Sequence, residues 1–336
     1  MSAEKSLVRA WYTKSSWLTL LLPLSWIVRI VSVLRRRFLQ WKYQGSPYPA
    51  PVVVVGNISV GGSGKTPLII SLAKSLTQRG FKVGVVSRGF GATADFYPMI
   101  VTSDSEVTKC GDEPLLIAQK CDCPVVVDPN RCRGVSEIIN EFACDVVLCD
   151  DGLQHYALHR DVEIVVLDSM RGHGNGHIIP AGPLREPVTR LNEVDFLVHN
   201  GGKGASEDGA RDVYVSLQPM GLRNAKTNEL VHHMNWKGPA IVYAVAGIGN
   251  PERFESTLLE MGFSPILSAK NDHESLLPED ILLGDSNETV VVTEKDIVKY
   301  KGPLPENLWI LEVEMSLSQK FIDDICHSAG LTFTAA

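Results

Sequence analysis

The most informative segment of the chain is Val52-Val-Val-Val-Gly-Asn-Ile-Ser-Val-Gly-Gly-Ser-Gly-Lys-Thr66. Its four consecutive valines are typical of a strand buried on both faces in a parallel sheet. The glycines that follow allow backbone N–H groups to turn inward, and a helix predicted over residues 67–78 adds partial positive charge at its N-terminus. Strand, loop and helix together predict a phosphate-binding loop.

This loop contains the residues that a nucleotide and its metal ion require. We expect Lys65 to reach the β- and γ-phosphates of ATP and the Thr66 hydroxyl to bind Mg²⁺. The standard pattern has glycine five residues before Gly64, where this chain has Ser59, and the doubled Gly61-Gly62 can supply the backbone freedom. The alternative is a glycine-rich turn without a ligand. The predicted ATP-binding residues are Ser59, Val60, Gly61, Gly62, Ser63, Gly64, Lys65 and Thr66.

Short apolar strands alternate with helices beyond the loop. Such alternation indicates a parallel sheet covered on both faces, so the predicted fold class is α/β with a P-loop NTPase-like domain. The further strands are predicted over residues 82–87, 124–127, 145–149, 163–167 and 196–199, with a helix over 133–142.

The length of 336 residues favours two domains. A loop-rich segment at 200–209 precedes predicted strands 213–217 and 229–233, which we expect to form a hairpin joining the domains. A second α/β pattern follows, with strands over 240–245 and 289–292 and a helix over 251–261. The predicted boundaries are 1–44 for a membrane-associating helix, 45–210 for the kinase domain, 211–236 for the hairpin linker and 237–336 for the smaller domain.

Charge is distributed unevenly along the chain. The net charge is −7, yet residues 1–44 carry eight basic side chains and one acid, which leaves −14 on the remainder. A basic, apolar N-terminus on an acidic body favours an anionic membrane surface and argues against nucleic acid, which requires a basic face on the folded body. The seven cysteines lack the paired spacing of a zinc site and are expected to be free thiols in a reducing compartment.

The apolar segment from Trp17 to Val33 is interrupted by Pro23 and Arg29 and is followed by three arginines at 35–37. A secretory signal peptide has its charge before the apolar run, so this segment does not match one. A helix lying in or partly embedded in the membrane fits best. A helix packed on the protein's own core and a true membrane span are the alternatives.

Adjacent carboxylates end the predicted strand 145–149. An acid at the carboxyl end of such a strand is the usual partner of nucleotide-bound Mg²⁺, so Asp150 and Asp151 are the candidate metal ligands together with Thr66. Two other polar clusters contain Asp112 and His273. Either cluster can supply the acceptor for a hydroxyl proton, and the first can equally be a helix cap.

The ordered motifs resemble the tetraacyldisaccharide 4'-kinase family, the membrane-associated lipid A kinases of Gram-negative bacteria. The resemblance extends from the N-terminal helix to about Lys299. The matching segments are Val55-Gly-Asn57, Gly61-Gly-Ser-Gly-Lys-Thr-Pro67, Ser87-Arg-Gly-Phe-Gly91, Gly111-Asp-Glu-Pro114, Asn130-Arg131, Asp150-Asp-Gly-Leu-Gln-His155, Gly174-Asn-Gly176, Pro180-Ala-Gly-Pro-Leu-Arg-Glu-Pro187, Ala246-Gly-Ile-Gly-Asn-Pro-Glu-Arg-Phe254, Asp272-His273 and Thr293-Glu-Lys-Asp296.

The resemblance implies transfer of the γ-phosphate of ATP to the 4'-hydroxyl of a tetraacyldisaccharide 1-phosphate, which gives lipid IVA in lipopolysaccharide biosynthesis. It implies that Asp112 acts as the base, paired with His273 from the second domain. It implies location at the cytoplasmic face of the inner membrane, peripheral or shallowly embedded. The other residues that it implicates are Asp150 and Asp151 at Mg²⁺, Lys65 and Thr66 on the phosphates, and Arg131, Arg185 and Glu186 near the reacting groups.

Two other classes of function remain in competition. A P-loop NTPase that hydrolyses nucleotide as a switch would bind protein partners, although no protein partner is evident from the sequence. A membrane scaffold that retained a nucleotide site would have no use for a base, and the acids at 112, 150 and 151 argue against it. Thr293-Glu-Lys295-Asp296 does not support guanine recognition and is either a strand-end turn with an ion pair or a nucleotide contact.

Overall fold

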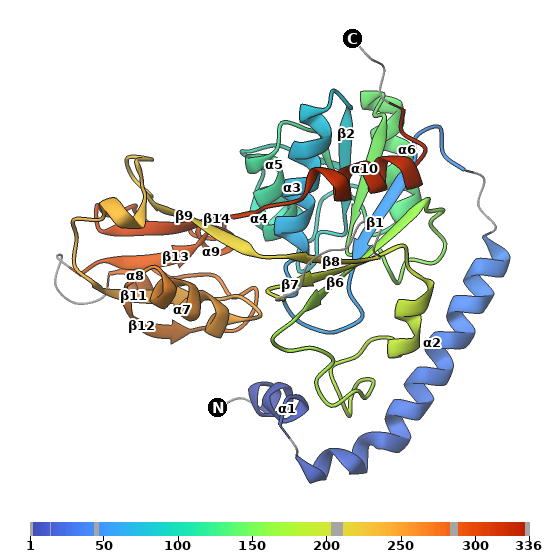
Figure 1. The fold of residues 1–336 in the computed structure, drawn as a ribbon, viewed down its shortest axis with the longest axis horizontal. Coiled ribbons are helices and arrows are strands. Elements are labelled where there is room, and N and C mark those ends of the chain that lie inside the picture. The colour runs from blue at the N-terminus through green and yellow to red at the C-terminus, as the bar shows by residue number, and fades with distance from the viewer. Residues whose placement is uncertain (1–2, 14, 44–46, 203–210, 283–287, 333–336) are drawn as a thin grey trace.

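The computed structural model describes residues 3–13, 15–43, 47–202, 211–282 and 288–332. These residues form two α/β domains, each built on its own sheet, together with an N-terminal helical arm (Figure 1). The predicted fold class is therefore confirmed.

The larger domain is organised by a sheet that, in the described part of the chain, has eight strands in the order β3-β4-β2-β5-β1-β6-β7-β8. Strand β3 is antiparallel to β4, and the other neighbours are parallel. The valine-rich strands β1, β2 and β5 are buried at every residue, as expected for the centre of such a sheet. The strands are β1 (Val52–Gly56), β2 (Val83–Ser87), β3 (Met99–Val101), β4 (Val125–Val127), β5 (Val146–Asp150), β6 (Val162–Asp168), β7 (Phe196–Asn200) and β8 (Asp212–Val215).

Helices cover both faces of this sheet. Leu72, Ile117 and Ile322 join the apolar cluster on one face, so α3 (Lys65–Gln78), α5 (Asp112–Lys120) and α10 (Gln319–Ser328) pack there. On the opposite face, Val135 and Ile138 bring α6 (Arg131–Phe142) into a separate cluster. The short elements α4 (Val107–Cys110) and η2 (Val188–Glu193) complete the domain.

The smaller domain is built on a six-stranded sheet of described residues, in the order β10-β9-β14-β13-β11-β12. Strands β12, β11, β13 and β14 are parallel, whereas β9 is antiparallel to both β14 and β10. Its strands are β9 (Leu217–Asn224), β10 (Leu230–Val231), β11 (Ile241–Ala246), β12 (Ser264–Ala269), β13 (Val290–Thr293) and β14 (Leu308–Met315). Its helices are η3 (His233–Asn235), α7 (Pro251–Glu260), α8 (Pro278–Ile281) and α9 (Glu294–Ile297).

The connection between the domains differs from the predicted hairpin of strands 213–217 and 229–233. Strand β8 stays in the first sheet beside β7, and the chain enters the second sheet only at β9. The long strands β9 and β14 form the antiparallel ribbon that leaves the larger domain (Figure 1). Part of the predicted loop-rich segment at 200–209 lies outside the described residues.

The C-terminal helix also departs from the predicted boundaries. Residues 237–336 were expected to form one domain, but Phe321, Ile322 and Ile325 of α10 are buried in the core of the larger domain. The chain therefore crosses between the domains twice, first at β9 and again after β14.

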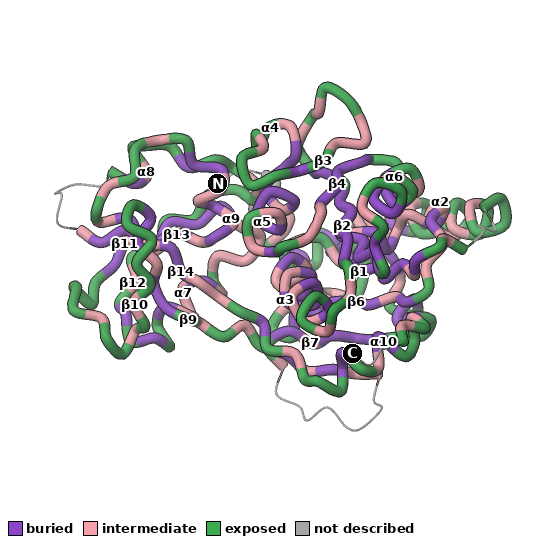
Figure 2. The backbone as a smooth tube through the Cα atoms, turned by 90° about the horizontal axis from the view of Figure 1, so that it is seen from above, coloured by how far each residue is buried: buried purple, intermediate pink, exposed green. Residues whose placement is uncertain are grey.

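The N-terminal arm consists of α1 (Ala3–Trp11), η1 (Ser16–Leu21) and α2 (Leu22–Lys42). Helix α2 runs along one side of the larger domain and stands away from the sheet (Figure 1), and its tube is mostly exposed or intermediate in burial (Figure 2). Its Ser25 hydroxyl donates to the Ile178 carbonyl at 2.7 Å and accepts from the Ala181 N–H at 3.0 Å. The helical segment Ser16–Lys42 is long and apolar enough to cross a membrane, judged by length and composition alone.

Candidate active site

The phosphate loop lies between β1 and α3, at the carboxyl edge of the first sheet, where ligands of such sheets bind. Gly61 and Gly64 adopt φ angles of 106° and 95°, which only glycine adopts readily. A Cβ at Gly64 would also lie 2.2 Å from the Asn200 side-chain nitrogen. The glycines are therefore required by both conformation and space.

A neighbouring segment fixes the first half of the loop. The Val60 N–H donates to the Pro183 carbonyl at 2.8 Å, and the Arg185 N–H donates to the Ile58 carbonyl at 2.6 Å. Ser59, between them, forms a bridge with Leu184. This pairing brings the Arg185 side chain to the edge of the phosphate loop.

Lys65 and Arg185 converge on the carboxylate of Asp151. Lys65 Nζ lies 3.4 Å from Asp151 Oδ1, and Arg185 Nη1 lies 3.1 Å from Oδ2. Burial acts to raise the pKa of Asp151, but the two cations outweigh it and lower this pKa to about 2. Asp151 is thus held ionised beside the lysine expected to bind phosphate.

Asp150 occupies the last position of β5 and has a different environment. Its Oδ2 accepts a hydrogen bond from the Ser87 hydroxyl at 3.0 Å, whereas its buried Oδ1 has no partner among the described residues. Burial, together with Glu113 and Asp151, raises the pKa of Asp150 to about 7. A cation at Oδ1 would both satisfy this oxygen and stabilise the charge.

The donor set suits Mg²⁺. Oxygen ligands are those that Mg²⁺ prefers, and nucleotide-bound Mg²⁺ takes one or two protein carboxylates besides phosphates and waters. Asp150, Asp151 and the Thr66 hydroxyl supply such oxygens next to the loop. The described residues contain no cluster of three or more His, Cys, Asp or Glu side chains that could hold a metal ion.

Arg131 and Glu186 form hydrogen bonds with the segments that surround this site. Arg131 is buried and donates to the backbone carbonyls of Asp128 at 2.9 Å and Asp150 at 3.1 Å, so its guanidinium braces the end of β5. Glu186 accepts from Gln154 at 2.7 Å and from the Tyr156 hydroxyl. Gln154 in turn donates to the Asn57 carbonyl at 3.0 Å, which links Glu186 to the start of the loop.

Asp112 and His273 come together across the domain boundary. Asp112 begins α5, and His273 follows β12 in the smaller domain at a φ of 63°. The imidazole Nδ1 lies 3.0 Å from Asp112 Oδ2, and its ring packs against Phe90 with centroids 5.2 Å apart. The contact joins residues that are 161 positions apart.

Each partner shifts the titration of the other. Burial acts to raise the pKa of Asp112, but the His273 hydrogen bond and the charges of Lys295, His273 and Lys299 outweigh it and lower this pKa. The hydrogen bond to Asp112 raises the pKa of His273, against burial and the charge of Lys295. The pair therefore favours a carboxylate with a protonated imidazole.

The contacts of Lys295 and Lys299 with Asp112 were not predicted from the sequence, although Lys295 lies in the segment 293–296 for which an ion pair was one of two alternatives. Lys295 Nζ and Lys299 Nζ lie 3.8 and 4.0 Å from Asp112 Oδ2, and Lys295 also pairs with Glu113 at 3.1 Å. Glu113 thereby connects the Asp112 cluster to Asp150, whose pKa it raises. The sequence feature that could have revealed the two lysines is their i, i+4 spacing just after a buried strand. This spacing places both side chains on one side of a helical turn.

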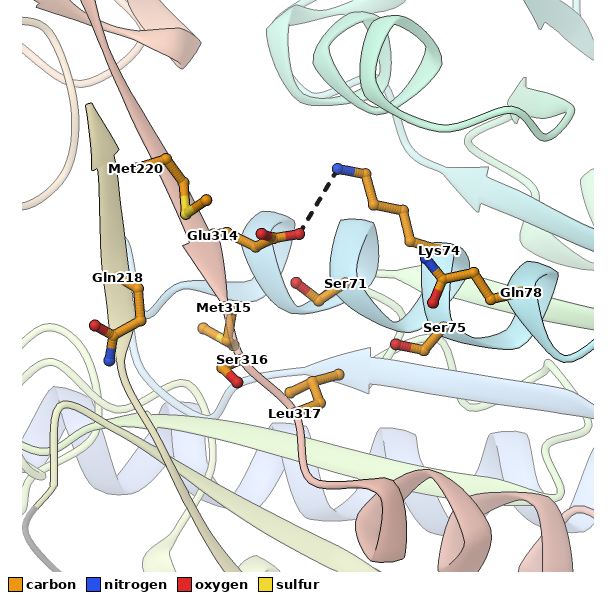
Figure 3. A pocket seen from close by; sticks show the side chains of 10 residues that line it. All are labelled: Ser71, Lys74, Ser75, Gln78, Gln218, Met220, Glu314, Met315, Ser316 and Leu317. Atoms are coloured by element: carbon orange, nitrogen blue, oxygen red, sulfur yellow. Dashed lines mark ion pairs between the residues drawn. The ribbon is translucent and has the colours of Figure 1, made fainter. Parts of the chain in front are cut away.

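A cavity of about 360 Å³ lies apart from these residues, between α3 and the β9–β14 ribbon (Figure 3). Lys74 and Glu314 face each other across it with 4.0 Å between their charged atoms. No phosphate-loop residue and no predicted catalytic residue lines it. It marks the groove where the ribbon passes the helix.

Comparisons with known proteins show which family the chain is similar to. The profile of the family described as tetraacyldisaccharide-1-P 4'-kinase matches residues 17–329. A tetraacyldisaccharide 4'-kinase of Ectopseudomonas mendocina is 44% identical over 326 residues, which cover 96% of each chain. One of Legionella pneumophila is 42% identical over 313 residues, covering 93% of this chain and 94% of the relative. The Aquifex aeolicus LpxK crystal structure in complex with ATP superposes with a TM-score of 0.74 at 26% identity, covering 93% and 99% of the two chains.

Proposed function

The chain belongs to the tetraacyldisaccharide-1-P 4'-kinase family, and from this premise we propose that Asp112, aligned by His273, accepts the proton of the sugar hydroxyl during phosphoryl transfer. The activity is the ATP-dependent phosphorylation of a tetraacylated disaccharide in lipid A biosynthesis. The observation that carries the residue assignment is the 3.0 Å contact between His273 Nδ1 and Asp112 Oδ2.

The proposed reaction is a single displacement. The 4'-hydroxyl oxygen bonds to the γ-phosphorus of ATP while the bond from that phosphorus to the β,γ-bridging oxygen breaks and ADP leaves. The hydroxyl proton passes to the Asp112 carboxylate. Its lowered pKa keeps Asp112 ionised and ready to accept at neutral pH, and the Lys295 and Lys299 charges hold it in place. The product is the 4'-phosphorylated disaccharide, lipid IVA.

The phosphate groups are assigned to residues 59–66 with Lys65 and Arg185. Backbone N–H groups at a glycine loop and helix N-terminus bind phosphate, and bidentate arginine is its usual side-chain partner. Lys65 and Arg185 both form ion pairs with Asp151 in the structure. A bound triphosphate would take the place of the Asp151 carboxylate as the negative charge next to these two cations.

Mg²⁺ is assigned to Thr66, Asp150 and Asp151, because the unpartnered Asp150 Oδ1 and its raised pKa fit a nearby cation. When bound, the ion neutralises charge on the transferring phosphates. Arg131 and Glu186 position this edge of the sheet through the contacts described above. They are not assigned a direct part in proton transfer.

Closure of the two domains completes the site in this proposal. Asp112 and His273 belong to different domains, so their pairing requires the smaller domain to approach the phosphate loop, which also expels water. Full turnover in protein cross-linked with the domains apart would overturn this step.

The lipid substrate and ATP place the enzyme at a membrane surface. Acyl chains reside in a bilayer and ATP is cytoplasmic, so we assign the protein to the cytoplasmic face of the inner membrane. The exposed apolar side chains of α2 support this assignment. The helix would lie in or partly within the bilayer surface.

The direct test is phosphate transfer from labelled ATP to a tetraacyldisaccharide 1-phosphate in detergent micelles with Mg²⁺. Asp112→Asn keeps the size of the side chain but removes the proton acceptor, so its rate should fall by about 10²-fold or more. Asp122→Asn, at an exposed position just after α5, is the matched control and should retain the wild-type rate. Hydrolysis of ATP without label in the lipid would favour the nucleotide-switch alternative.

A further inference from the structure

We propose that Arg253, on the smaller domain, is a positioning residue for ATP that acts through Asn200 on the phosphate loop. Arg253 lies in the first turn of α7, and Asn200 ends β7 in the larger domain. This inference rests on the proposed binding of ATP by residues 59–66.

The Asn200 side chain holds the phosphate loop by a hydrogen bond to its backbone. Its side chain is 1% exposed, and its Nδ2 donates to the Ser63 carbonyl at 2.9 Å. A Cβ at Gly64 would collide with the same nitrogen at 2.2 Å. The Gly64 N–H belongs to the same trans peptide as the Ser63 carbonyl, so it points the opposite way, away from Asn200. An N–H group fixed in this way is a donor that a phosphate can use.

The contact with Arg253 sets the orientation of the Asn200 side-chain amide. Its Nη2 donates to Asn200 Oδ1 at 2.7 Å. A guanidinium can only donate, so it selects the oxygen side of the amide, and the nitrogen side is left to face Ser63. Gly201, at a φ of 82°, leaves the room required, because a Cβ there would lie 3.2 Å from the same guanidinium nitrogen.

The start of α7 is docked on the larger domain by other contacts as well. Asn250 Nδ2 donates to Asp168 Oδ2 at 3.0 Å, and the Gly249 backbone approaches so closely that a Cβ would lie 2.6 Å from the Gly62 nitrogen. Among these contacts, the one through Arg253 orients a side chain that holds the phosphate loop. ATP binding and the Arg253–Asn200 contact should therefore favour each other.

The test is a double-mutant cycle on ATP affinity, measured by calorimetry with ATP and Mg²⁺ in the absence of lipid acceptor. Arg253→Ala and Asn200→Ala should each raise the Kd about tenfold, the size of one lost hydrogen bond to a charged group. The double variant should be no weaker than the weaker single variant, because both changes break one relay. Arg253→Lys retains a donor and should recover part of the affinity.

A matched control separates this relay from general docking. Asn250→Ser keeps a residue that can cap α7 but loses the contact with Asp168, so its Kd should stay within about twofold of wild type. At saturating ATP and lipid, Arg253→Ala should retain most of the wild-type kcat, since the residue does not touch the Asp112–His273 pair.

Two results would overturn the inference: an unchanged Kd for Arg253→Ala, or effects that multiply to about 100-fold in the double variant, which would indicate a direct contact with ATP. Arg253 is partly exposed, so its variants decide the question even if substitution of the buried Asn200 prevents folding. Wild-type protein that binds no ATP would instead overturn the proposed function and this inference with it.

Discussion

Asp150 and Asp151 are neighbours in sequence with opposite electrostatic surroundings. Asp150 ends a buried strand and faces other acids, which raises its pKa to about 7. Asp151 enters a turn at a φ of 46° and points to Lys65 and Arg185, so that its pKa falls to about 2. The change of direction at this turn therefore separates a carboxylate that needs a cation from one that already has two.

The Asp112–His273 pair leads to a prediction on pH and stability. The folded-state pKa of His273 is raised above 6.5, so its contribution is fully present below that pH and is lost as pH rises through the raised value. The pKa of Asp112 is lowered below 3.8, so its contribution is present above that pH and is lost in stronger acid. The pair should therefore stabilise most between pH 3.8 and 6.5.

Denaturation of wild type and His273→Gln at about pH 5.5 and about pH 9, roughly 3.5 units apart, measures this effect. The variant should lose stability mainly at the lower pH, by no more than about 1 kcal/mol, because the imidazole is partly exposed. His177→Gln, at an exposed histidine of the larger domain, should show no such dependence. A deficit that is the same at both pH values would contradict the prediction.

The central strands and the phosphate loop were predictable from local sequence. Runs such as Val52–Val55 are buried on both faces of the sheet, and an uninterrupted run of apolar residues predicts such burial from composition alone. Which sheet a strand joins is not local information. Strands β8 and β9 are separated only by Ser216, yet they belong to different domains, and β9 pairs with β14 about ninety positions later.

The residues of the candidate site also fall into two groups, those that local sequence predicts and those that depend on contacts between distant segments. Residues 59–66, Asp150 and Asp151 follow from a loop and a strand end, each readable within a few positions. The approach of Asp112 and His273 was implied by family resemblance, because no periodicity connects residues 161 positions apart. Asn200 was missed entirely, since one asparagine after a strand is a common turn residue and its role depends on Ser63 and Arg253.

The junction of α5, α9 and β14 gives a prediction at the scale of elements. Lys120 of α5 pairs with Glu294 and Glu312, which lie on the smaller domain. Burial raises the pKa of Glu294 from 4.5 to about 7. Because the folded-state pKa is raised, the wild type loses stability as pH rises from 4.5 through 7.

Glu294→Gln removes this ionisation while keeping the size of the side chain. Its stability relative to wild type should therefore increase between pH 5 and pH 8, by up to about 3 kcal/mol in urea denaturation. Glu314→Gln, on the exposed side of β14, is the matched control and should show no change with pH. A relative stability of Glu294→Gln that falls with pH would contradict the assignment.

The whole molecule combines an acidic body with a basic, apolar arm. Exposed side chains of α2 include Trp26, Ile27 and Ile30, which are 64%, 58% and 59% exposed, whereas Ser25 is buried against the body. A row of exposed apolar residues on a helix held at one edge is unusual on a protein surrounded by water. A lipid surface would cover this face and attract the exposed Arg35 and Arg37.

Substitution of this face should separate membrane binding from folding and chemistry. Ile27→Ser with Ile30→Ser should reduce sedimentation with anionic phospholipid vesicles by about tenfold or more, given the apolar area removed from contact with lipid. The melting temperature should be unchanged, because these side chains contribute little to the core. Leu304→Ser, which changes a 42% exposed leucine of the smaller domain, should bind vesicles as wild type does. If the double variant melted earlier and still sedimented with vesicles, α2 would instead be packing against protein, and the basic residues of the arm would need another partner.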